Sequence, residues 1–231
     1  MQLNTHTWGE GDHTALLVHG IMADHRAWRT VGPALADKGY RVIAVDLRGH
    51  GLSERGDSYA PEDFADDLVE TLPAGAELAV GHSLGALVLS LAVDRLRPAR
   101  AVYSDPAWHL ELPGGFGPEL FAEFKSASRE QIAMLNPRWA AEDVDVEVAT
   151  LALWDEASAL ALAGFKDRDM LPAKPVVPSL VQLADPSMLI NEERAELLRG
   201  RGFEVRTVKG AGHTVQRDDF DGFMSSLDGW I

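Results

Sequence analysis

The sequence predicts an α/β protein with a doubly wound, mostly parallel sheet and a helical insertion. Short aliphatic runs alternate with helical patterns along most of the chain, and most of these runs are apolar on both faces. Such runs are typical of parallel strands buried between two layers of helices. The segment 108–174 breaks the alternation with helical patterns and no evident strand. We therefore predict a core of residues 1–107 and 175–231 and an insertion of residues 108–174 over one edge of the sheet.

Six segments have the composition of buried strands. Each is a short run of β-branched or aliphatic residues, and most lead directly into Gly, Asp or Ser-Asp-Pro. These loop signals mark the points where strands end. The predicted strands are Ala15–Val18, Arg41–Val45, Leu78–Val80, Ala101–Tyr103, Leu180–Leu183 and Phe203–Val208.

Helical patterns lie between these strands. Apolar residues recur at helical spacing over 28–36, and Gly39 ends that segment. Pro61 begins a second helix over 61–72, because proline fits the first helical turn. A third, apolar helix covers 84–96 and ends before Pro98. Within 108–174, the Ala, Leu, Phe and Trp content predicts two or three more helices.

Charge and composition exclude several classes of partner. The net charge of −15 repels phosphate backbones and anionic membranes. There are no cysteines, so disulfides, thiolate catalysis and Cys-ligated zinc are absent. Neither an H-E-x-x-H motif nor a dense His/Asp cluster is visible, so we expect no metal and no cofactor.

The start of the chain lacks a signal-peptide pattern and no apolar run approaches the length of a membrane span, so we expect a cytoplasmic protein acting on a small molecule. Oligomeric state is left open.

Ser83 is the candidate nucleophile. Gly81–Gly85 matches G-x-S-x-G, and the motif follows a predicted strand and opens a predicted helix. That strand–turn–helix context is the one a nucleophile elbow requires, and glycines are needed where the turn has no room for Cβ atoms. The helix N-terminus also offers the N–H of Leu84 to a developing oxyanion.

His213 is the candidate general base. It follows the last predicted strand in a glycine-flanked loop, Gly210–His213. An imidazole titrates near neutrality, which suits a group that takes a proton and later returns it. In parallel sheets the carboxyl ends of the strands meet at one edge, so we expect His213 to reach Ser83 there.

At this point the chain resembles the α/β-hydrolase family. The matching pieces are Val18–Ile21, Asp46–Ser53, Gly81–Gly85 and Gly210–His213, which follow the order of that family. The resemblance implies a catalytic triad, an oxyanion hole formed by the N–H groups of Ile21 and Leu84, and a cap formed by the helical insertion. The chain is compact for this family, since only Gln2–Trp8 is left for strands before Leu16.

The triad acid has two candidates. The resemblance places the usual acid after the strand 180–183, where this chain has Ser187, and the nearby Asp185 is two residues early. Some members of the family instead carry their acid after the preceding strand, where Asp105 lies here. Serine cannot stabilise an imidazolium by charge, which favours Asp105, with Asp185 as the alternative. We expect Asp46 to hold loops together.

These residues predict a serine hydrolase that cleaves a small apolar ester, lactone or thioester through an acyl-enzyme. Aromatic residues of the insertion are candidates for the substrate pocket. They are Trp108, Phe116, Phe121, Trp139 and Trp154. The same scaffold also permits a carbon–carbon hydrolase, a cofactor-free lyase or a ligand-binding receptor with little turnover.

Overall fold

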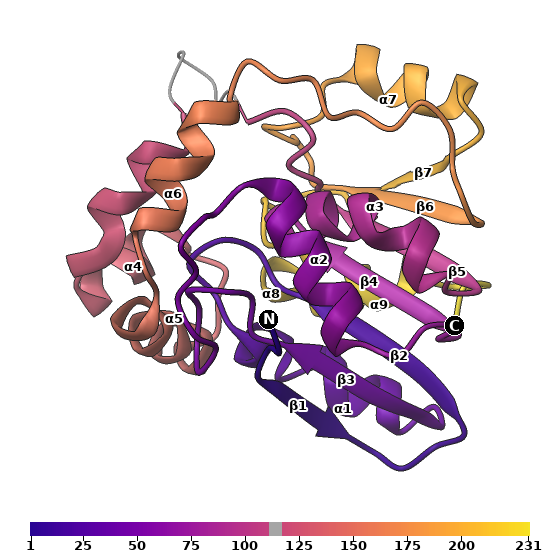
Figure 1. Cartoon of the computed structure of the whole chain (residues 1–231), viewed down its shortest axis with the longest axis horizontal. Helices are drawn as coiled ribbons and strands as arrows, with labels where there is room; N and C mark the ends of the chain where they lie inside the picture. Colours follow the sequence, from indigo (N-terminus) through magenta and orange to yellow (C-terminus); the bar gives the residue numbers. More distant parts are fainter. Residues whose placement is uncertain (111–116) are drawn as a thin grey trace.

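A computed structural model describes residues 1–110 and 117–231, and the described residues form one sheet of seven strands with helices on both faces (Figure 1). The strands are β1 (Thr5–Trp8), β2 (His13–Val18), β3 (Tyr40–Val45), β4 (Leu78–His82), β5 (Arg100–Ser104), β6 (Ser179–Leu183) and β7 (Glu204–Thr207). Their order is β1-β3-β2-β4-β5-β6-β7. Only the edge strand β1 runs antiparallel within the described sheet. The predicted doubly wound, mostly parallel sheet is confirmed.

The three helices predicted between the strands of the core are present, one of them with a later start, and further helices that were not predicted follow β6 and β7. The α-helices are α1 (Val31–Ala36), α2 (Pro61–Thr71), α3 (Leu84–Leu96), α4 (Arg129–Leu135), α5 (Ala141–Leu153), α6 (Ala157–Leu162), α7 (Glu192–Gly200), α8 (Val215–Asp218) and α9 (Phe220–Ser225). The 3-10 helices are η1 (His25–Trp28), η2 (Pro118–Ser126) and η3 (Ala163–Phe165). The helix expected over 28–36 begins only at Val31. Trp28 belongs instead to η1, because the side chain of Asp24 caps that separate turn.

Two apolar cores lie on opposite faces of the sheet. Alternate residues of each strand point to opposite faces, so Leu16 and Val18 join one core while Ala15 and Leu17 join the other. Helices α2, α3 and α7 pack on the first face, and α1, α8 and α9 pack on the second. This two-sided burial is the physical reason why the strands read as continuous apolar runs in the sequence.

The insertion lies between β5 and β6 and carries η2, α4, α5, α6 and η3 (Figure 1). The described part of 108–174 contains no strand. It has a small apolar cluster of its own, which includes Ile132, Val144 and Trp154. Among the described residues, no single helix is long and apolar enough to cross a membrane; α5 and α6–η3, bent by 80° at their junction, reach that length and composition only as a pair.

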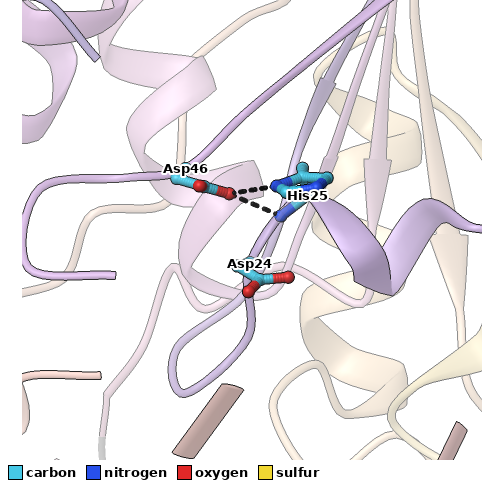
Figure 2. Close-up of side chains that lie close together, drawn as sticks. All are labelled: Asp24, His25 and Asp46. Carbon is cyan, nitrogen blue, oxygen red and sulfur yellow. Dashed lines mark hydrogen bonds and ion pairs between the residues drawn. The ribbon is translucent and has the colours of Figure 1, made fainter. Parts of the chain in front are cut away.

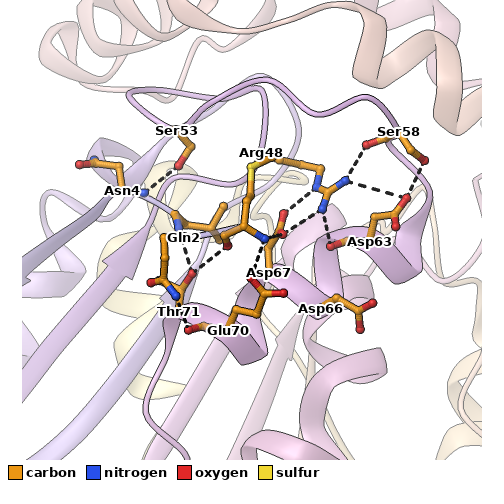
Figure 3. A network of polar contacts seen from close by, with 12 residues as sticks. Gln2, Asn4, Arg48, Ser53, Ser58, Asp63, Asp66, Asp67, Glu70 and Thr71 are labelled. Carbon is orange, nitrogen blue, oxygen red and sulfur yellow. Dashed lines mark hydrogen bonds and ion pairs between the residues drawn. The ribbon is translucent and has the colours of Figure 1, made fainter.

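Arg48 fastens the loop after β3 to α2 (Figure 3). Its guanidinium donates to both carboxylate oxygens of Asp67, at 2.6 and 2.9 Å, and to the carbonyl of Ser58 at 2.7 Å. Arg48 is buried, and a bidentate pair of this kind fixes geometry as well as charge. The same loop reaches the insertion, since the carbonyl of Gly49 accepts from the N–H of Asp155 at 2.7 Å.

Candidate active site

Ser83 and Asp105 lie side by side at the carboxyl edge of the sheet. Strands β4 and β5 are parallel neighbours, and their register pairs His82 with Ser104. The next residue of each strand is therefore Ser83 in one case and Asp105 in the other. Both residues are buried, so bulk water competes little for the hydrogen bonds of their side chains.

The turn at Ser83 has the geometry of a nucleophile elbow. Ser83 has φ 53° and ψ −117°, a left-handed conformation that costs free energy in a residue with a side chain. A Cβ added at Gly81 would lie 2.5 Å from the carbonyl oxygen of Gly85, and one at Gly85 would lie 2.2 Å from that of Val18. Both glycines of the motif are thus required by close backbone approach.

His213 bridges the serine and the acid. Its Nε2 lies 2.9 Å from Ser83 Oγ, and its Nδ1 lies 2.6 Å from Asp105 Oδ2. Since the carboxylate can only accept, Nδ1 carries the proton in the neutral imidazole and Nε2 is free to accept from the serine hydroxyl. The two contacts create a serine–histidine–aspartate relay from three separate strand ends.

Asp105 is held ionised. Burial opposes its negative charge, but the hydrogen bond from His213, together with the Ser187 hydroxyl and the Ala184 N–H, lowers the pKa of the Asp105 carboxyl below its usual value. In the sequence, Ser187 only marks a position where the family's usual acid is missing. In the structure its side chain supports the acid that follows the neighbouring strand, a role that no local sequence pattern indicates.

Asp185 does not contact His213. It is exposed, and its carboxylate accepts from the N–H of Gly210 at 3.2 Å. Its own N–H donates to the carbonyl of Ala211 at 2.8 Å. Asp185 therefore holds the loop that carries the histidine rather than the imidazole itself.

Two backbone N–H groups are available near Ser83. Leu84 is the first residue of α3, and the first N–H groups of a helix have no acceptor within it. Ile21 follows β2 in a loop where Met22 adopts a left-handed φ of 67°. Ile21, Ser83 and Leu84 line the same cavity, so an oxygen bound beside Ser83 can lie near both backbones.

His82 supports the position of His213. Its ring is buried 4.8 Å from the ring of His213, and its Nε2 lies 2.9 Å from the carbonyl oxygen of His213. Burial and the neighbouring imidazole lower the pKa of His82 to about 3. His82 is therefore neutral near pH 7 and donates its Nε2–H to that carbonyl, which ties the histidine loop to the elbow.

A cavity of about 310 Å³ opens beside the serine. Among the described residues that line it, only Ser83 and His213 are polar. Leu110, Leu162 and Leu189 form part of its wall, and Phe121 and Phe124 come from η2 of the insertion. The leucines were not predicted from the sequence, because their place in the wall depends on how the insertion packs on the core.

The predicted pocket aromatics divide into three groups. Phe121 lines the cavity just described, and Phe121 and Trp139 line a second cavity next to it. Trp108 and Trp154 are wrong as pocket residues: both are fully buried and line neither cavity. Trp108 packs against Tyr103 and Phe203, and Trp154 belongs to the apolar cluster of the insertion. Phe116 lies outside the described residues.

The expectation that the chain has no His/Asp cluster is wrong at one place. Asp24, His25 and Asp46 bring possible ligand atoms within 4.8 Å of one another (Figure 2). Asp46 already accepts from the N–H and Nδ1 of His25, both at 2.8 Å, and also from Asn4 and Leu52. Asp24 accepts from Arg26. Since both carboxylates are saturated with donors, the cluster fits the predicted loop-holding role of Asp46.

Comparison with known sequences gives a family and several relatives. A sequence model described as the alpha/beta hydrolase family matches residues 15–225. A 2-(acetamidomethylene)succinate hydrolase of Mesorhizobium japonicum is 41% identical over 88 residues, 36% of this chain and 31% of the relative. A dihydrolipoyllysine-residue acetyltransferase component of an acetoin cleaving system from Pseudomonas putida is 29% identical over 238 residues, 91% of this chain and 61% of the relative. The chain thus spans less than two thirds of these curated relatives.

Solved structures share the fold. An E-2-(acetamidomethylene)succinate hydrolase superposes with a TM-score of 0.80 at 23% identity, covering 98% of this chain and 94% of the other. An esterase from Exiguobacterium antarcticum gives a TM-score of 0.78 at 17% identity, covering 99% and 94%. At these identities the likeness concerns the fold alone.

Proposed function

Because the chain belongs to the alpha/beta hydrolase family, we propose that it is a serine hydrolase that cleaves a small apolar ester, lactone or thioester through an acyl-enzyme. The observation that carries the proposal is the relay of contacts from Asp105 through His213 to Ser83, at 2.6 and 2.9 Å. A relay of this kind makes a weak nucleophile reactive, since the base stands within hydrogen-bond reach of the hydroxyl and is itself oriented by a third group.

The reaction has two halves. In the first, Ser83 Oγ attacks the substrate carbonyl while His213 Nε2 takes the hydroxyl proton, and Asp105 stabilises the imidazolium that forms. The N–H groups of Ile21 and Leu84 stabilise the oxyanion of the tetrahedral intermediate. The imidazolium then gives its proton to the leaving group, which departs. In the second half, His213 removes a proton from water as the water oxygen bonds to the acyl carbon. The tetrahedral intermediate then breaks the acyl–Oγ bond, protonated His213 returns the proton to Ser83 Oγ, and the carboxylic acid product leaves.

The apolar cavity beside Ser83 supports an apolar substrate. A wall made of leucine, phenylalanine and other apolar side chains binds hydrocarbon by removing it from water. Among its relatives are proteins named as hydrolases, including the 2-(acetamidomethylene)succinate hydrolase. These names support hydrolysis as the class of reaction for this chain, and the choice among ester, lactone and thioester is part of the proposal.

Replacing Ser83 by alanine tests this function. We expect Ser83→Ala to reduce kcat on an activated p-nitrophenyl ester by about 10⁴-fold or more, because the nucleophile is lost, while circular dichroism and the unfolding midpoint stay those of the native protein. A fluorophosphonate should label the native protein at Ser83 and leave the variant unlabelled.

Two outcomes would contradict the proposal. If Ser83→Ala keeps more than a few per cent of the native rate, Ser83 is not the nucleophile. If the probe labels Ser83 but no ester, lactone or thioester of a broad panel is hydrolysed, a lyase, a carbon–carbon hydrolase or a ligand-binding receptor fits better.

A further inference from the structure

A second cavity of about 280 Å³ adjoins the apolar one at the serine. Ser83 and His213 line both, together with Ile21, Phe121, Phe124 and Met188. Beyond this shared part the walls differ in chemistry. The second cavity is also lined by Glu147 of α5, Gln216 and Arg217 of α8, and Trp139 of the insertion. A substrate bound at Ser83 can therefore extend in two directions, one lined by apolar side chains and one whose apolar wall also carries polar and charged side chains.

The charged groups in and behind the polar wall are already paired with each other. Arg217 Nη1 donates to Glu147 Oε2 at 2.6 Å, and Arg217 Nε lies 3.8 Å from Asp143. Asp143 also accepts from Arg29 at 2.7 Å. Two arginines thus face two carboxylates, and this cluster carries no net charge. Because the charges of this cluster cancel and the whole chain has a net charge of −15, an anionic ligand would find no net positive charge here.

The side-chain amide of Gln216 lacks hydrogen-bond partners. Its side chain is buried, with the residue 1% exposed, and within the described part of the chain neither Nε2 nor Oε1 has a hydrogen-bond partner. Trp139 Nε1 and Arg217 Nη2 also have no hydrogen-bond acceptor there. The amide of Gln216 has no hydrogen-bond partner among the described protein groups, so only water or a ligand in the cavity can supply its hydrogen bonds. The wall therefore suits a ligand group that both accepts and donates.

We propose that the second cavity binds a neutral carboxamide group of the substrate, which pairs with Gln216 through one hydrogen bond in each direction. The inference rests on the proposed hydrolase function, since it places this group on a substrate whose carbonyl is attacked by Ser83. An amide matches the wall in charge and in its donor and acceptor, whereas a carboxylate adds an unpaired charge and offers only acceptors. The apolar part of the same substrate occupies the first cavity.

The test compares p-nitrophenyl esters whose acyl chains end in a carboxamide, a carboxylate or an isosteric isopropyl group, over a series of chain lengths. At the best length, we expect kcat/KM for the carboxamide to exceed that for either analogue by about tenfold or more, as two added hydrogen bonds allow. Gln216→Met should abolish this preference. That variant breaks no side-chain hydrogen bond within the described protein, so we expect it to fold. Gln2→Met makes the same change at an exposed glutamine that lines neither cavity and should keep the preference.

Binding to Ser83→Ala separates this proposal from the proposed function. Calorimetry with hexanamide and hexanoate should show tighter binding of the amide, and Gln216→Met in the same background should remove the difference. Binding of this kind supports the amide site even if no ester is hydrolysed. The proposal is overturned if neither rates nor binding favour the amide, if the carboxylate is preferred, or if Gln216→Met retains the preference.

Discussion

Left-handed backbone conformations gather at the candidate site. Within the described residues, the non-glycine residues with positive φ are Met22, Ser83, Arg97 and Asp105. Ser83 and Asp105 belong to the proposed triad, and Met22 follows Ile21, whose N–H is part of the proposed oxyanion hole. Such conformations persist only where surrounding contacts hold them. These strained conformations lower the stability of the fold, and they orient the backbone and side chains of the proposed site.

The two aspartates should differ strongly when each is changed to asparagine. Asp105→Asn removes the charge that stabilises protonated His213, so we expect kcat to fall by about 10⁴-fold. Asp185→Asn keeps an oxygen that can accept from Gly210, and we expect a loss of less than about tenfold, since the change acts on a turn. Steady-state kinetics of both variants on one ester, at neutral and at alkaline pH, measure the difference.

Comparable losses in the two variants would contradict the assignment of separate roles. A large loss in Asp185→Asn beside a mild one in Asp105→Asn would reverse it. Native unfolding midpoints for both proteins are the control, because a variant that is partly unfolded would lose activity for another reason.

At the scale of elements, the helical insertion completes the site. The core supplies Ser83, Asp105 and His213 from strand ends, while η2 supplies Phe121 and Phe124 to both cavities. The insertion is tied to the core by Arg29 with Asp143, at 2.7 Å, and by Arg217 with Glu147. We therefore expect substrate range to depend on elements that contribute no residue to the relay itself.

Shortening Phe121 should change the preferred chain length. Phe121→Ala removes a ring from the wall of the apolar cavity, so we expect the optimum among alkyl p-nitrophenyl esters to move to longer chains. Each methylene newly buried should raise kcat/KM about fourfold, which corresponds to ~0.8 kcal/mol per buried CH₂. Phe165→Ala is the matched control, since Phe165 packs on the core and lines neither cavity. An unchanged optimum in Phe121→Ala would mean that the alkyl chain lies elsewhere.

At the scale of the whole molecule, buried histidines make stability depend on pH. Burial lowers the pKa of His50 to about 3, as it does for His82, from the ordinary value of 6.5. Between these values the unfolded chain takes up protons that the folded protein refuses, so stability falls as pH falls below 6.5. His25 has the opposite sign, because its hydrogen bond to Asp46 raises its pKa and its contribution is lost only as pH rises above 6.5.

Replacing His50 should flatten this dependence. Each buried neutral histidine contributes about 1.4 kcal/mol of unfolding free energy per pH unit in this range. His50→Asn keeps a donor for the carbonyl of Arg48 but cannot take up the proton, so the slope between about pH 6.5 and 5 should shrink by about one histidine's share. Urea unfolding at several pH values measures it. His25→Asn should leave the slope in this window unchanged, and a native slope in His50→Asn would disprove the argument.

The sequence alone predicts six of the seven described strands, three helices of the core and the elbow at Ser83, but not the spatial order of the strands. Buried parallel strands are apolar on both faces, and the elbow motif is a short run of consecutive residues, so both are visible in the sequence. The close approach at Gly81 is also local, since it involves Gly85, whereas the close approach at Gly85 involves Val18 of β2. The approach of His213 to Ser83 also followed, since the ends of parallel strands meet at one edge.

Features that depend on contacts between residues distant in the sequence could not be predicted and are seen only in the folded structure. The register of β4 with β5 brings Asp105 rather than Asp185 to His213, and Ser187 supports that carboxylate from the next strand. The folded chain buries Trp108 and Trp154 away from the cavities, and it places Gln216 of α8 in the wall of one of them. The sequence pattern around an aromatic or amide residue is the same whether its side chain lies in a core or in a pocket. The difference lies in which surfaces meet, and that is fixed only when the whole chain has folded.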